Sequence, residues 1–322
     1  MIKTGIIGGA GYTAGELLRL LINHPKVEIV FVHSTSNAGN KITDVHEGLI
    51  GETELVFSDN YSFEGLDALF LCSAHGDSKK FMEENIVPDK LKVIDLSTDY
   101  RHKASAAGFV YGLPELNRDV IKKTTRLANP GCFATAIQLA VLPLAANKLL
   151  IDEVHVNAIT GSTGAGVKPS ATTHFSWRDN NISVYKPFEH QHLKEIRESV
   201  VRLQEDFDRE ILFVPVRGNF SRGIFASIYT SCDLSLEEIK KYYDEYYKKA
   251  AFTFVTDRNP DLKEVVNTNK CVLHLEKHGN KLFIVSVIDN LLKGASGQAV
   301  QNFNLMFGLD EKEGLNLKPS AF

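Results

Sequence analysis

A glycine-rich turn near the N-terminus constrains the fold of this chain more than any other feature of the sequence. Residues 3–8 form an apolar run typical of a buried strand, and a helical pattern with leucines on one face follows the turn Gly8-Gly9-Ala10-Gly11-Tyr12-Thr13-Ala14. Gly8 permits the tight turn, Gly11 lets a pyrophosphate approach N–H groups at the helix start, and Ala14 keeps the helix close to the sheet. This arrangement predicts a dinucleotide-binding βαβ unit, with a purely structural turn as the alternative.

Strand patterns alternate with helical patterns in the N-terminal third of the chain. This rhythm predicts right-handed βαβ units and a parallel sheet. The strands are expected at residues 3–8, 27–32, 66–72 and 91–96, with helices at residues 13–24 and in the stretch that ends near Asn85.

The pattern changes after Pro130, where an apolar helix over residues 133–144 is followed by long β patterns. Strands that no helix separates favour antiparallel pairing, and His278-Gly279-Asn280 has the length of a hairpin turn. This part is therefore predicted to be an α+β domain with an antiparallel or mixed sheet. Its strands are expected at 153–160, 211–216, 224–232, 271–276 and 281–288, with helices at 191–207 and 235–249, and a last helix at 297–307 that returns to the first domain.

The composition excludes several classes of protein. The chain has 36 lysines and arginines against 40 aspartates and glutamates, a net charge of −4, so it lacks the cation excess of a dedicated nucleic-acid-binding protein. No apolar run reaches the ~18 residues of a membrane span, and the N-terminus has no signal-peptide layout. The four cysteines lie far apart, which argues against disulfides and zinc sites. We expect a cytoplasmic protein that binds no membrane, nucleic acid or metal.

A tyrosine-rich run over residues 242–247 has the composition of a base-stacking platform. Its spacing, however, suits the buried face of an amphipathic helix. We therefore predict that these tyrosines pack in the protein core.

The loop after the second predicted strand bears on cofactor choice. Sites specific for NAD place an acidic residue there to bind the ribose 2′-hydroxyl. Here the loop reads His33-Ser34-Thr35-Ser36-Asn37 and contains no acid, while Lys41 follows nearby. Hydroxyls and amides accept a 2′-phosphate without repulsion, so NADP is the predicted cofactor. The alternative is an exposed polar loop without a role in binding.

Cys132 is the candidate nucleophile. It follows Asn129-Pro130-Gly131, a sequence that forces a turn, and the apolar helix begins directly after it. The positive end of a helix dipole lowers the pKa of a thiol placed there, which favours the reactive thiolate. Cys72, Cys232 and Cys271 lie inside strand patterns and suit the role of small buried side chains. With a dinucleotide domain, a reactive cysteine predicts either aldehyde oxidation through a thioester or the reverse reduction of an acyl phosphate.

At these residues the chain resembles the N-acetyl-gamma-glutamyl-phosphate reductase family, type 1, along nearly its whole length. The resemblance rests on Gly11-Tyr12-Thr13 with Glu16-Leu17, on residues 95–101, 111–116, 129–132 and 161–166, on His190-Gln191-His192 and on residues 289–302. It implies a Rossmann-type NADP-binding domain, residues 1–131 plus 299–322. It also implies an α+β catalytic and dimerisation domain of the glyceraldehyde-phosphate and aspartate-semialdehyde dehydrogenase type, residues 132–298.

The implied reaction is reduction of an N-acyl-gamma-glutamyl 5-phosphate by NADPH, through a Cys132 thioester, to the N-acyl-glutamate 5-semialdehyde. Phosphate is released, the step belongs to arginine biosynthesis, and the family implies a homodimer or homotetramer. The reaction needs a general acid and base near Cys132. His192 is the first candidate, with Glu195 three residues later to orient it. His190 is the fallback, because only one of two residues two apart on a helix can face the cysteine.

The remaining site candidates follow from the same resemblance. Arg101 is expected to bind a substrate anion, with a surface salt bridge as the competing interpretation. The substrate-binding set is Arg101, Asn129, His190 and Glu195, and the cofactor-binding set is Gly8, Gly11, Tyr12, Thr13, Ala14, Ser34, Thr35, Ser36, Ser73, Asn290 and Lys293.

Two departures from the family pattern are visible. The turn has Ala14-Gly15 where the family has glycine before alanine, and Phe188-Glu189-His190-Gln191-His192 replaces a Gly-His-Arg-His motif. The second departure exchanges a cation for Gln191, so the N-acyl group, acetyl or succinyl, stays open. The alternatives are an enzyme like aspartate-semialdehyde dehydrogenase and a non-catalytic NADP-binding sensor.

Overall fold

Two units of the chain each have a sheet and a core of their own in the computed structural model, which describes residues 1–320. The first unit comprises Met1–Pro130 and Ala295–Asn316, and the second comprises Gly131–Gly294 with residues 317–320. The sequence analysis instead assigned all residues after 298 to the first domain.

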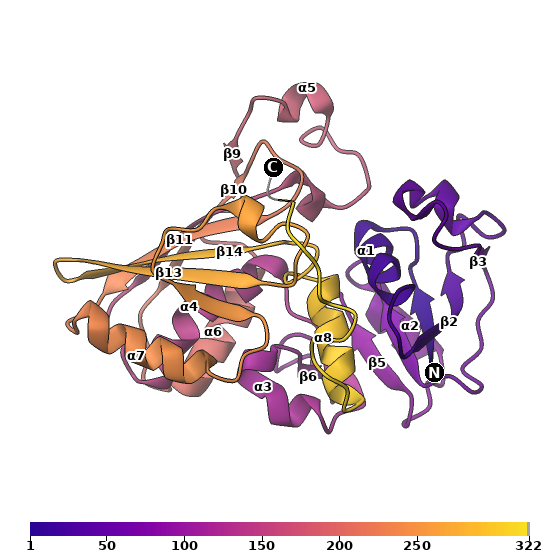
Figure 1. The fold of residues 1–322 in the computed structure, drawn as a ribbon, viewed down its shortest axis with the longest axis horizontal. Coiled ribbons are helices and arrows are strands. Elements are labelled where there is room, and N and C mark those ends of the chain that lie inside the picture. The colour runs from indigo at the N-terminus through magenta and orange to yellow at the C-terminus, as the bar shows by residue number, and fades with distance from the viewer. Residues whose placement is uncertain (321–322) are drawn as a thin grey trace. The chain divides into compact units, whose positions relative to one another are not determined.

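The first unit is built on a seven-stranded sheet in the order β3-β2-β1-β4-β5-β7-β6, and every neighbouring pair is parallel (Figure 1). The parallel α/β fold predicted from the sequence is confirmed. The strands are β1 (Ile2–Ile7), β2 (Val27–His33), β3 (Phe57–Ser58), β4 (Ala68–Leu71), β5 (Lys92–Asp95), β6 (Val110–Tyr111) and β7 (Arg126–Ala128). The helices are α1 (Tyr12–Leu21), α2 (Asp77–Glu84), α3 (Pro114–Ile121) and α8 (Ser296–Met306).

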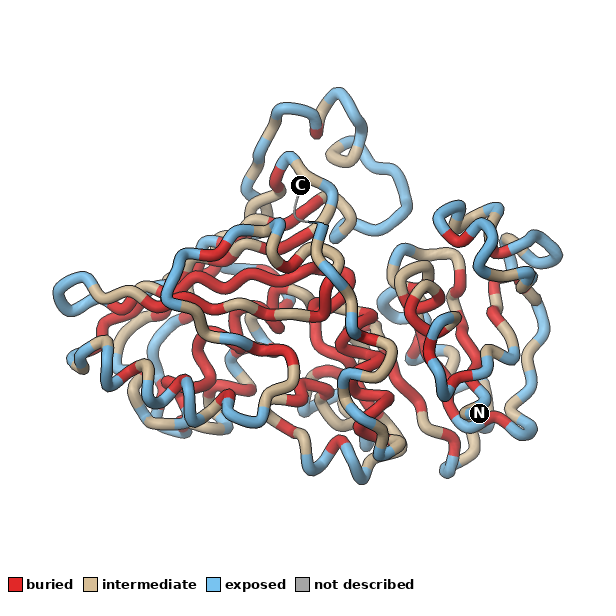
Figure 2. The backbone as a smooth tube through the Cα atoms, viewed as in Figure 1, coloured by how far each residue is buried: buried red, intermediate tan, exposed pale blue. Residues whose placement is uncertain are grey.

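The central strands of this sheet are covered on both faces. All four residues of β4, Ala-Leu-Phe-Leu, are buried, as are the last four residues of β1. Parallel strands are continuous apolar runs for this reason, since neither face meets water. Figure 2 shows the buried strands as red tube.

The second unit contains a mixed seven-stranded sheet in the order β12-β13-β14-β11-β8-β10-β9. Only β12–β13 and β8–β10 pair in parallel, and β13–β14 is the expected hairpin, with Gly279 at a φ of +57°. The predicted α+β architecture with a mixed sheet is confirmed. The strands are β8 (Val154–Thr160), β9 (Ser183–Val184), β10 (Ile211–Arg217), β11 (Ile224–Ser231), β12 (Thr253–Thr256), β13 (Cys271–His278) and β14 (Lys281–Ile288).

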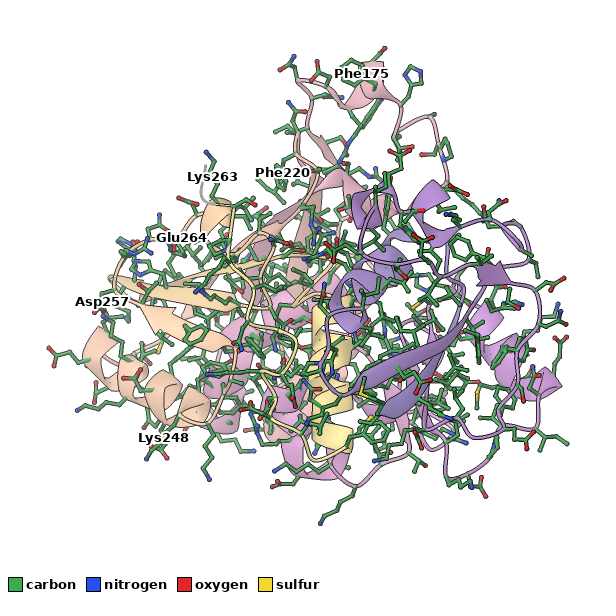
Figure 3. All side chains as sticks on the ribbon, turned by 45° about the vertical axis from the view of Figure 1, so that its right-hand side comes forward. Phe175, Phe220, Lys248, Asp257, Lys263 and Glu264 are labelled. Carbon is green, nitrogen blue, oxygen red and sulfur yellow. The ribbon has the colours of Figure 1, made fainter. Side chains whose placement is uncertain are left out.

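Three helices, α4 (Cys132–Ala146), α6 (His192–Leu203) and α7 (Leu236–Tyr247), lie on one face of the mixed sheet (Figure 1). Every residue of α4 from Phe133 to Ala145 is buried, as expected of a helix that is apolar all round. A long excursion between β8 and β10 carries the short helix α5 (Phe175–Arg178) and the edge strand β9. Phe175 projects from the outer end of this excursion (Figure 3) and is 77% exposed.

The tyrosine-rich helix α7 packs against α4, and the prediction that its tyrosines are buried is confirmed for Tyr243 and Tyr247, whereas Tyr242 is exposed. Tyr243 donates a hydrogen bond to the Ala140 carbonyl, and Tyr247 donates one to the Leu139 carbonyl. Pro143 lies inside α4 and has no N–H, so the Leu139 carbonyl four residues earlier lacks its helical donor. The Tyr247 hydroxyl replaces that donor.

No helix among residues 1–320 has both the length and the apolar character that crossing a bilayer requires.

The Tyr247 contact predicts a double-mutant result. Tyr247→Phe should lower the free energy of unfolding, measured by urea titration, by about 1–3 kcal/mol, because a buried carbonyl loses its donor. Adding Pro143→Ala should recover part of that loss, since an alanine N–H restores the helical hydrogen bond. Tyr242→Phe, at a 37% exposed position, is the control and should change little. Equal losses with and without proline would contradict the explanation.

Candidate active site

The glycine turn of the first unit has the geometry of a phosphate-binding loop. Gly8 adopts a φ of +80°, and a Cβ built on it would lie 2.9 Å from the Ser73 nitrogen and the Cys72 carbonyl, so the ends of β1 and β4 abut. Gly11 is the N-cap of α1, and no atom lies within 4 Å of the Cβ position built on it. The first N–H groups of the helix, those of Tyr12 and Thr13, therefore begin beside open space that an anion can enter. These residues fit a dinucleotide pyrophosphate.

A histidine that the sequence analysis missed supports this turn. His46 Nε2 lies 2.7 Å from the Gly9 carbonyl oxygen, and a Cβ on Gly15 would lie 2.6 Å from His46 Nδ1. The order Ala14-Gly15 has a physical reason here: Ala14 is fully buried against the sheet, and position 15 has no room for a side chain. No local pattern around residue 46 indicates this contact.

The loop after β2 is a small network of hydroxyls and amides. The Asn37 amide donates to Ser34 Oγ at 3.3 Å and to Ser36 Oγ at 3.0 Å, while Thr35 and Ser36 are exposed. Lys41, expected nearby as a cation, forms an exposed ion pair with Glu54 at 3.0 Å.

Arg101 joins the ends of two strands of the parallel sheet. Its Nε donates to the Asn129 carbonyl at 2.7 Å and its Nη2 to the Leu96 carbonyl at 2.8 Å, and the residue is 7% exposed. Arg101 is thus not a surface residue. Both ends of the Asn129 side-chain amide are also hydrogen-bonded. Its Nδ2 donates to the Ala295 carbonyl at 3.0 Å, and its Oδ1 accepts from Asn302 Nδ2 at 3.1 Å.

Cys132 is the first residue of α4 in the second unit, and Gly131 is the N-cap. Glu195, from the first turn of α6, is 2% exposed, and its Oε2 accepts a hydrogen bond from the Gly131 N–H at 3.0 Å. A carboxylate at the positive end of a helix is favourable, so this contact fixes the start of α4 and with it the cysteine.

The His192 ring lies against the residue before the cysteine. A Cβ built on Gly131 would lie 2.3 Å from His192 Nε2, so only glycine allows the ring to sit there. The same nitrogen is 3.8 Å from Glu195 Oε1. His192, Glu195 and the start of α4 therefore form one cluster.

His190 lies beside His192 rather than away from it. The two rings are 4.6 Å apart, and both contact Phe133, at centroid distances of 5.5 Å for His190 and 6.3 Å for His192. The expectation that only one of them can face the cysteine applies if both are helical, but His190 precedes α6, which begins at His192. The rule for helix faces does not apply to it.

His190 is held neutral near pH 7. Burial and the positive charge of Lys186 together lower its pKa from 6.5 to about 4, and Glu195 opposes them. Its Nδ1 accepts the His192 backbone N–H at 3.2 Å, so the neutral ring carries its proton on Nε2. Phe213 and Tyr185 complete the aromatic surroundings of the ring.

Asn290 and its neighbours connect three loops near Cys132. The Asn290 side chain accepts from the Gly223 N–H at 2.7 Å and donates to Thr163 Oγ1 at 3.0 Å, which holds the 161–166 loop. Gly294 packs so closely that a Cβ on it would lie 2.8 Å from the Cys132 Cβ. Lys293 is fully buried in the same segment.

The other cysteines have structural surroundings. Cys232 and Cys271 are buried, and Cys271 Sγ lies 3.7 Å from Ser286 Oγ inside the sheet. Burial raises the pKa of the Cys72 thiol. Cys132 is the cysteine among residues 1–320 that begins a helix.

Tyr185 and Arg217 form a further group that the sequence analysis missed. The guanidinium carbon of Arg217 lies 4.1 Å from the centre of the Tyr185 ring, which in turn packs on His190 at 5.7 Å. Burial and the negative charge of Cys132 raise the pKa of Tyr185. The segment from 167 to 189 has no clear periodicity, so no sequence pattern indicates that it returns to the cysteine.

The two units define the semialdehyde dehydrogenase class. Residues 3–124 match the semialdehyde dehydrogenase NAD binding domain, and residues 132–290 match the semialdehyde dehydrogenase dimerisation domain. Within that class the chain belongs to the N-acetyl-gamma-glutamyl-phosphate reductase family. Enzymes of that name from Azobacteroides pseudotrichonymphae, Parabacteroides distasonis and Flavobacterium johnsoniae are 67%, 65% and 57% identical to it, over the full length of both chains in each case.

Solved structures of distant relatives share the fold. Aspartate semialdehyde dehydrogenase II from Vibrio cholerae, complexed with ASA, has a TM-score of 0.73 at 14% identity and covers 96% of this chain and 98% of its own. Aspartate semialdehyde dehydrogenase with NADP from Candida albicans has a TM-score of 0.69 at 16% identity, covering 95% of this chain and 98% of its own. Among the described residues, no group of histidine, cysteine and acidic side chains could hold a metal ion.

The pKa of His190 predicts how stability depends on pH. Between pH 6.5 and about 4 the unfolded chain binds a proton at His190 that the folded chain does not bind, so the free energy of unfolding falls as the pH falls. The His190→Gln variant should show a flatter fall over this range in urea titrations. His278→Gln, at an exposed hairpin histidine, is the control, and a wild-type-like fall in His190→Gln would contradict the assignment.

Proposed function

We propose that the protein reduces an N-acyl-gamma-glutamyl 5-phosphate to the N-acyl-glutamate 5-semialdehyde with NADPH, releasing phosphate, as a step of arginine biosynthesis. The observation that carries the proposal is the placement of Cys132 at the start of α4, with His192 packed on Gly131 and Glu195 bonded to its N–H. The family membership and the names of the full-length relatives support the substrate class.

Cys132 acts as the nucleophile in this reaction. Its sulfur attacks the acyl carbon, the phosphate leaves, and a thioester joins the substrate to the enzyme. The dipole of α4 favours negative charge at the sulfur before the attack and again when the product leaves.

His192 moves the proton. The reduced thioester becomes a thiohemiacetal, whose collapse to aldehyde and thiolate needs an acid and base within reach of Cys132. The contact of the ring with Gly131, next to the nucleophile, supports His192 in this role, and Glu195 positions the ring. His190 is held neutral, so it suits hydrogen bonding to the substrate better than proton transfer.

NADPH, when bound, supplies the hydride. The pyrophosphate is assigned to Gly8, Gly11, Tyr12, Thr13 and Ala14, the 2′-phosphate to Ser34, Thr35 and Ser36, and further contacts to Ser73, Asn290 and Lys293. The open space at Gly11 supports the first assignment, and the absence of an acid from residues 33–37 supports NADP over NAD.

The substrate is assigned to Arg101, Asn129, His190 and Glu195. Arg101 and Asn129 lie together at the ends of β5 and β7, the edge of a parallel sheet where ligands bind in α/β proteins. Their side chains donate hydrogen bonds to backbone carbonyls and so shape this edge.

We further propose that the enzyme is a homodimer or homotetramer in the cytoplasm. The match of residues 132–290 to a dimerisation domain supports the oligomer. Four widely spaced cysteines support a reducing compartment.

Replacing the nucleophile tests the reaction. Cys132→Ser should lower the rate of NADPH oxidation with N-acetyl-gamma-glutamyl phosphate by on the order of 10³-fold or more. NADPH binding should persist, because the glycine turn lies in the other unit. Cys232→Ala is the control and should keep its activity. A serine variant that turns over normally would exclude the thioester. A wild type that binds NADPH but does not turn over would favour the alternative of a non-catalytic NADP-binding sensor.

Cofactor preference tests the loop after β2. We expect kcat/KM to be about 10–100-fold higher with NADPH than with NADH, the scale of one or two hydrogen bonds to a charged group. Thr35→Asp should shift the preference toward NADH by introducing the missing acid, while Ser62→Asp, an exposed position elsewhere in the first unit, should not. Preference for NADH in the wild type would show that this loop does not bind a 2′-phosphate.

A further inference from the structure

Arg178 and Arg217 form a cationic pair in the second unit that no carboxylate of residues 1–320 neutralises. Arg178, the last residue of α5, is 9% exposed, and its Nη2 group is buried without a hydrogen-bond acceptor in the described part of the chain. Arg217, the last residue of β10, is half-buried and stacks on Tyr185. Neither side chain forms an ion pair with an acidic residue among residues 1–320.

The two arginines are held near one another by the backbone. The Asn219 amide, in the orientation that satisfies both of its ends, bonds the Arg178 carbonyl at 3.1 Å and the Asn180 N–H at 3.0 Å. Asn219 follows Arg217 by two residues, and Arg217 pairs with Ser183 of β9. Burial and the positive charge of Arg217 lower the pKa of Arg178, which agrees with this proximity.

A continuous series of contacts leads from this pair to the nucleophile. Arg217 stacks on Tyr185, Tyr185 packs on His190, and His190 packs on Phe133, the residue after Cys132. The exposed Lys186 adds a third positive charge, which acts on His190. The acidic residues of this excursion, Asp179 and Glu189, are exposed and do not pair with the arginines.

Two like-charged arginines held near one another, one of them with a buried unbonded N–H, oppose folding. An unsatisfied buried polar group costs about 1–3 kcal/mol, and more when it is charged. Planar guanidinium groups bind carboxylates and phosphates through paired hydrogen bonds, so such an anion would satisfy both arginines at once.

We propose that Arg178 and Arg217 are a subsite for an anionic group of the acyl substrate, on the Tyr185 side of Cys132. The inference rests on the proposed reaction for the identity of the substrate, but the binding of an anion to the pair is independent of it. The group is either the phosphate that leaves or a carboxylate of the acyl chain, which share the same hydrogen-bonding chemistry.

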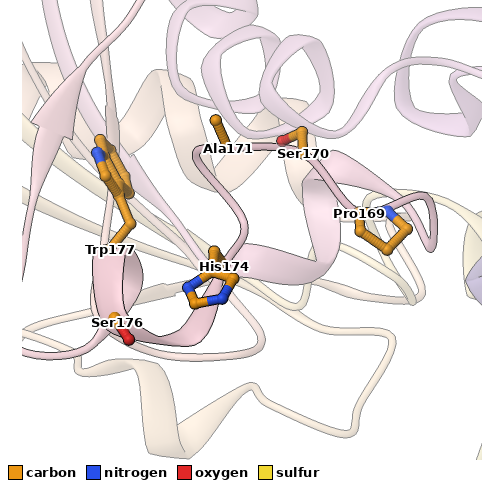
Figure 4. Close-up of a pocket in the computed structure, with 6 residues that line it drawn as sticks. All are labelled: Pro169, Ser170, Ala171, His174, Ser176 and Trp177. Carbon is orange, nitrogen blue, oxygen red and sulfur yellow. The ribbon is translucent and has the colours of Figure 1, made fainter.

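The single tryptophan of the chain gives a direct readout. Trp177 directly precedes Arg178 and lines a hollow of about 590 Å³ together with His174 (Figure 4). Inorganic phosphate and succinate, titrated separately at constant ionic strength, should change its fluorescence and raise the melting temperature of the wild type. Arg178→Gln and Arg178→Lys should weaken both responses by about tenfold or more, whereas Arg209→Gln, an exposed arginine beside Asp208, should not.

Arg178→Gln should also be more stable than the wild type without anions, because the repulsion and the unbonded N–H are removed. Losses of stability in both Arg178 variants, with no anion response in the wild type, would overturn the subsite. The binding and melting measurements need no turnover. They therefore test anion binding to the arginines even if the proposed reaction is wrong.

Kinetics in the direction of semialdehyde oxidation identify the anionic group. If the pair binds the phosphate, Arg178→Gln raises the KM for phosphate about tenfold and leaves that for the semialdehyde unchanged. If it binds a carboxylate, the KM for the semialdehyde rises instead, and comparison of N-acetyl and N-succinyl semialdehydes shows whether the carboxylate belongs to the acyl group. Unchanged KM values for all of these substrates would contradict the proposal.

Discussion

The hydrogen bond between the Gly131 N–H and the Glu195 carboxylate is the interaction on which the site depends. It places a buried negative group at the positive end of α4 and thereby defines where that helix begins. Cys132 is the first helical residue for this reason. Because Gly131 has no side chain, the His192 ring can lie against the same backbone. One contact between α4 and α6 therefore positions Cys132, His192 and Glu195, for which we propose the roles of nucleophile, proton-transfer group and orienting carboxylate.

The helix α4, which carries the proposed nucleophile Cys132, is itself unusual, because it is apolar on every face and contains a proline. Burial on all sides gives α4 a fixed position, but Pro143 leaves the Leu139 carbonyl without its helical donor. The Tyr247 hydroxyl from α7 donates a hydrogen bond to that carbonyl in its place. The rigidity of α4 thus rests on hydrogen bonds from a neighbouring helix as well as on hydrophobic packing.

Side chains of both charges lie around the His190 ring and the start of α4. Glu195 supplies the negative group at the start of α4. Arg178 and Lys186, on the excursion that carries α5 and β9, supply positive charge, as does Arg217 at the end of β10. His190 lies between them in an aromatic environment that keeps it neutral. In the proposed reaction an anionic group of the substrate meets these cations, and it would offset the cost in stability of the buried, unbonded Nη2 of Arg178.

Local sequence determined much of this protein, and contacts between distant residues decided the rest. The glycine turn, the alternation of strands and helices, the hairpin at Gly279 and the position of Cys132 after Pro130-Gly131 all follow from neighbouring residues, because turn geometry and hydrophobic period are local properties. Other contacts depend on how separate elements pack. They are the packing of His46 against Gly15, the hydrogen bond from the Gly131 N–H to Glu195, and the approach of Arg178 to Arg217. No local pattern encodes them, since the partners lie in different elements and only the folded chain brings them together.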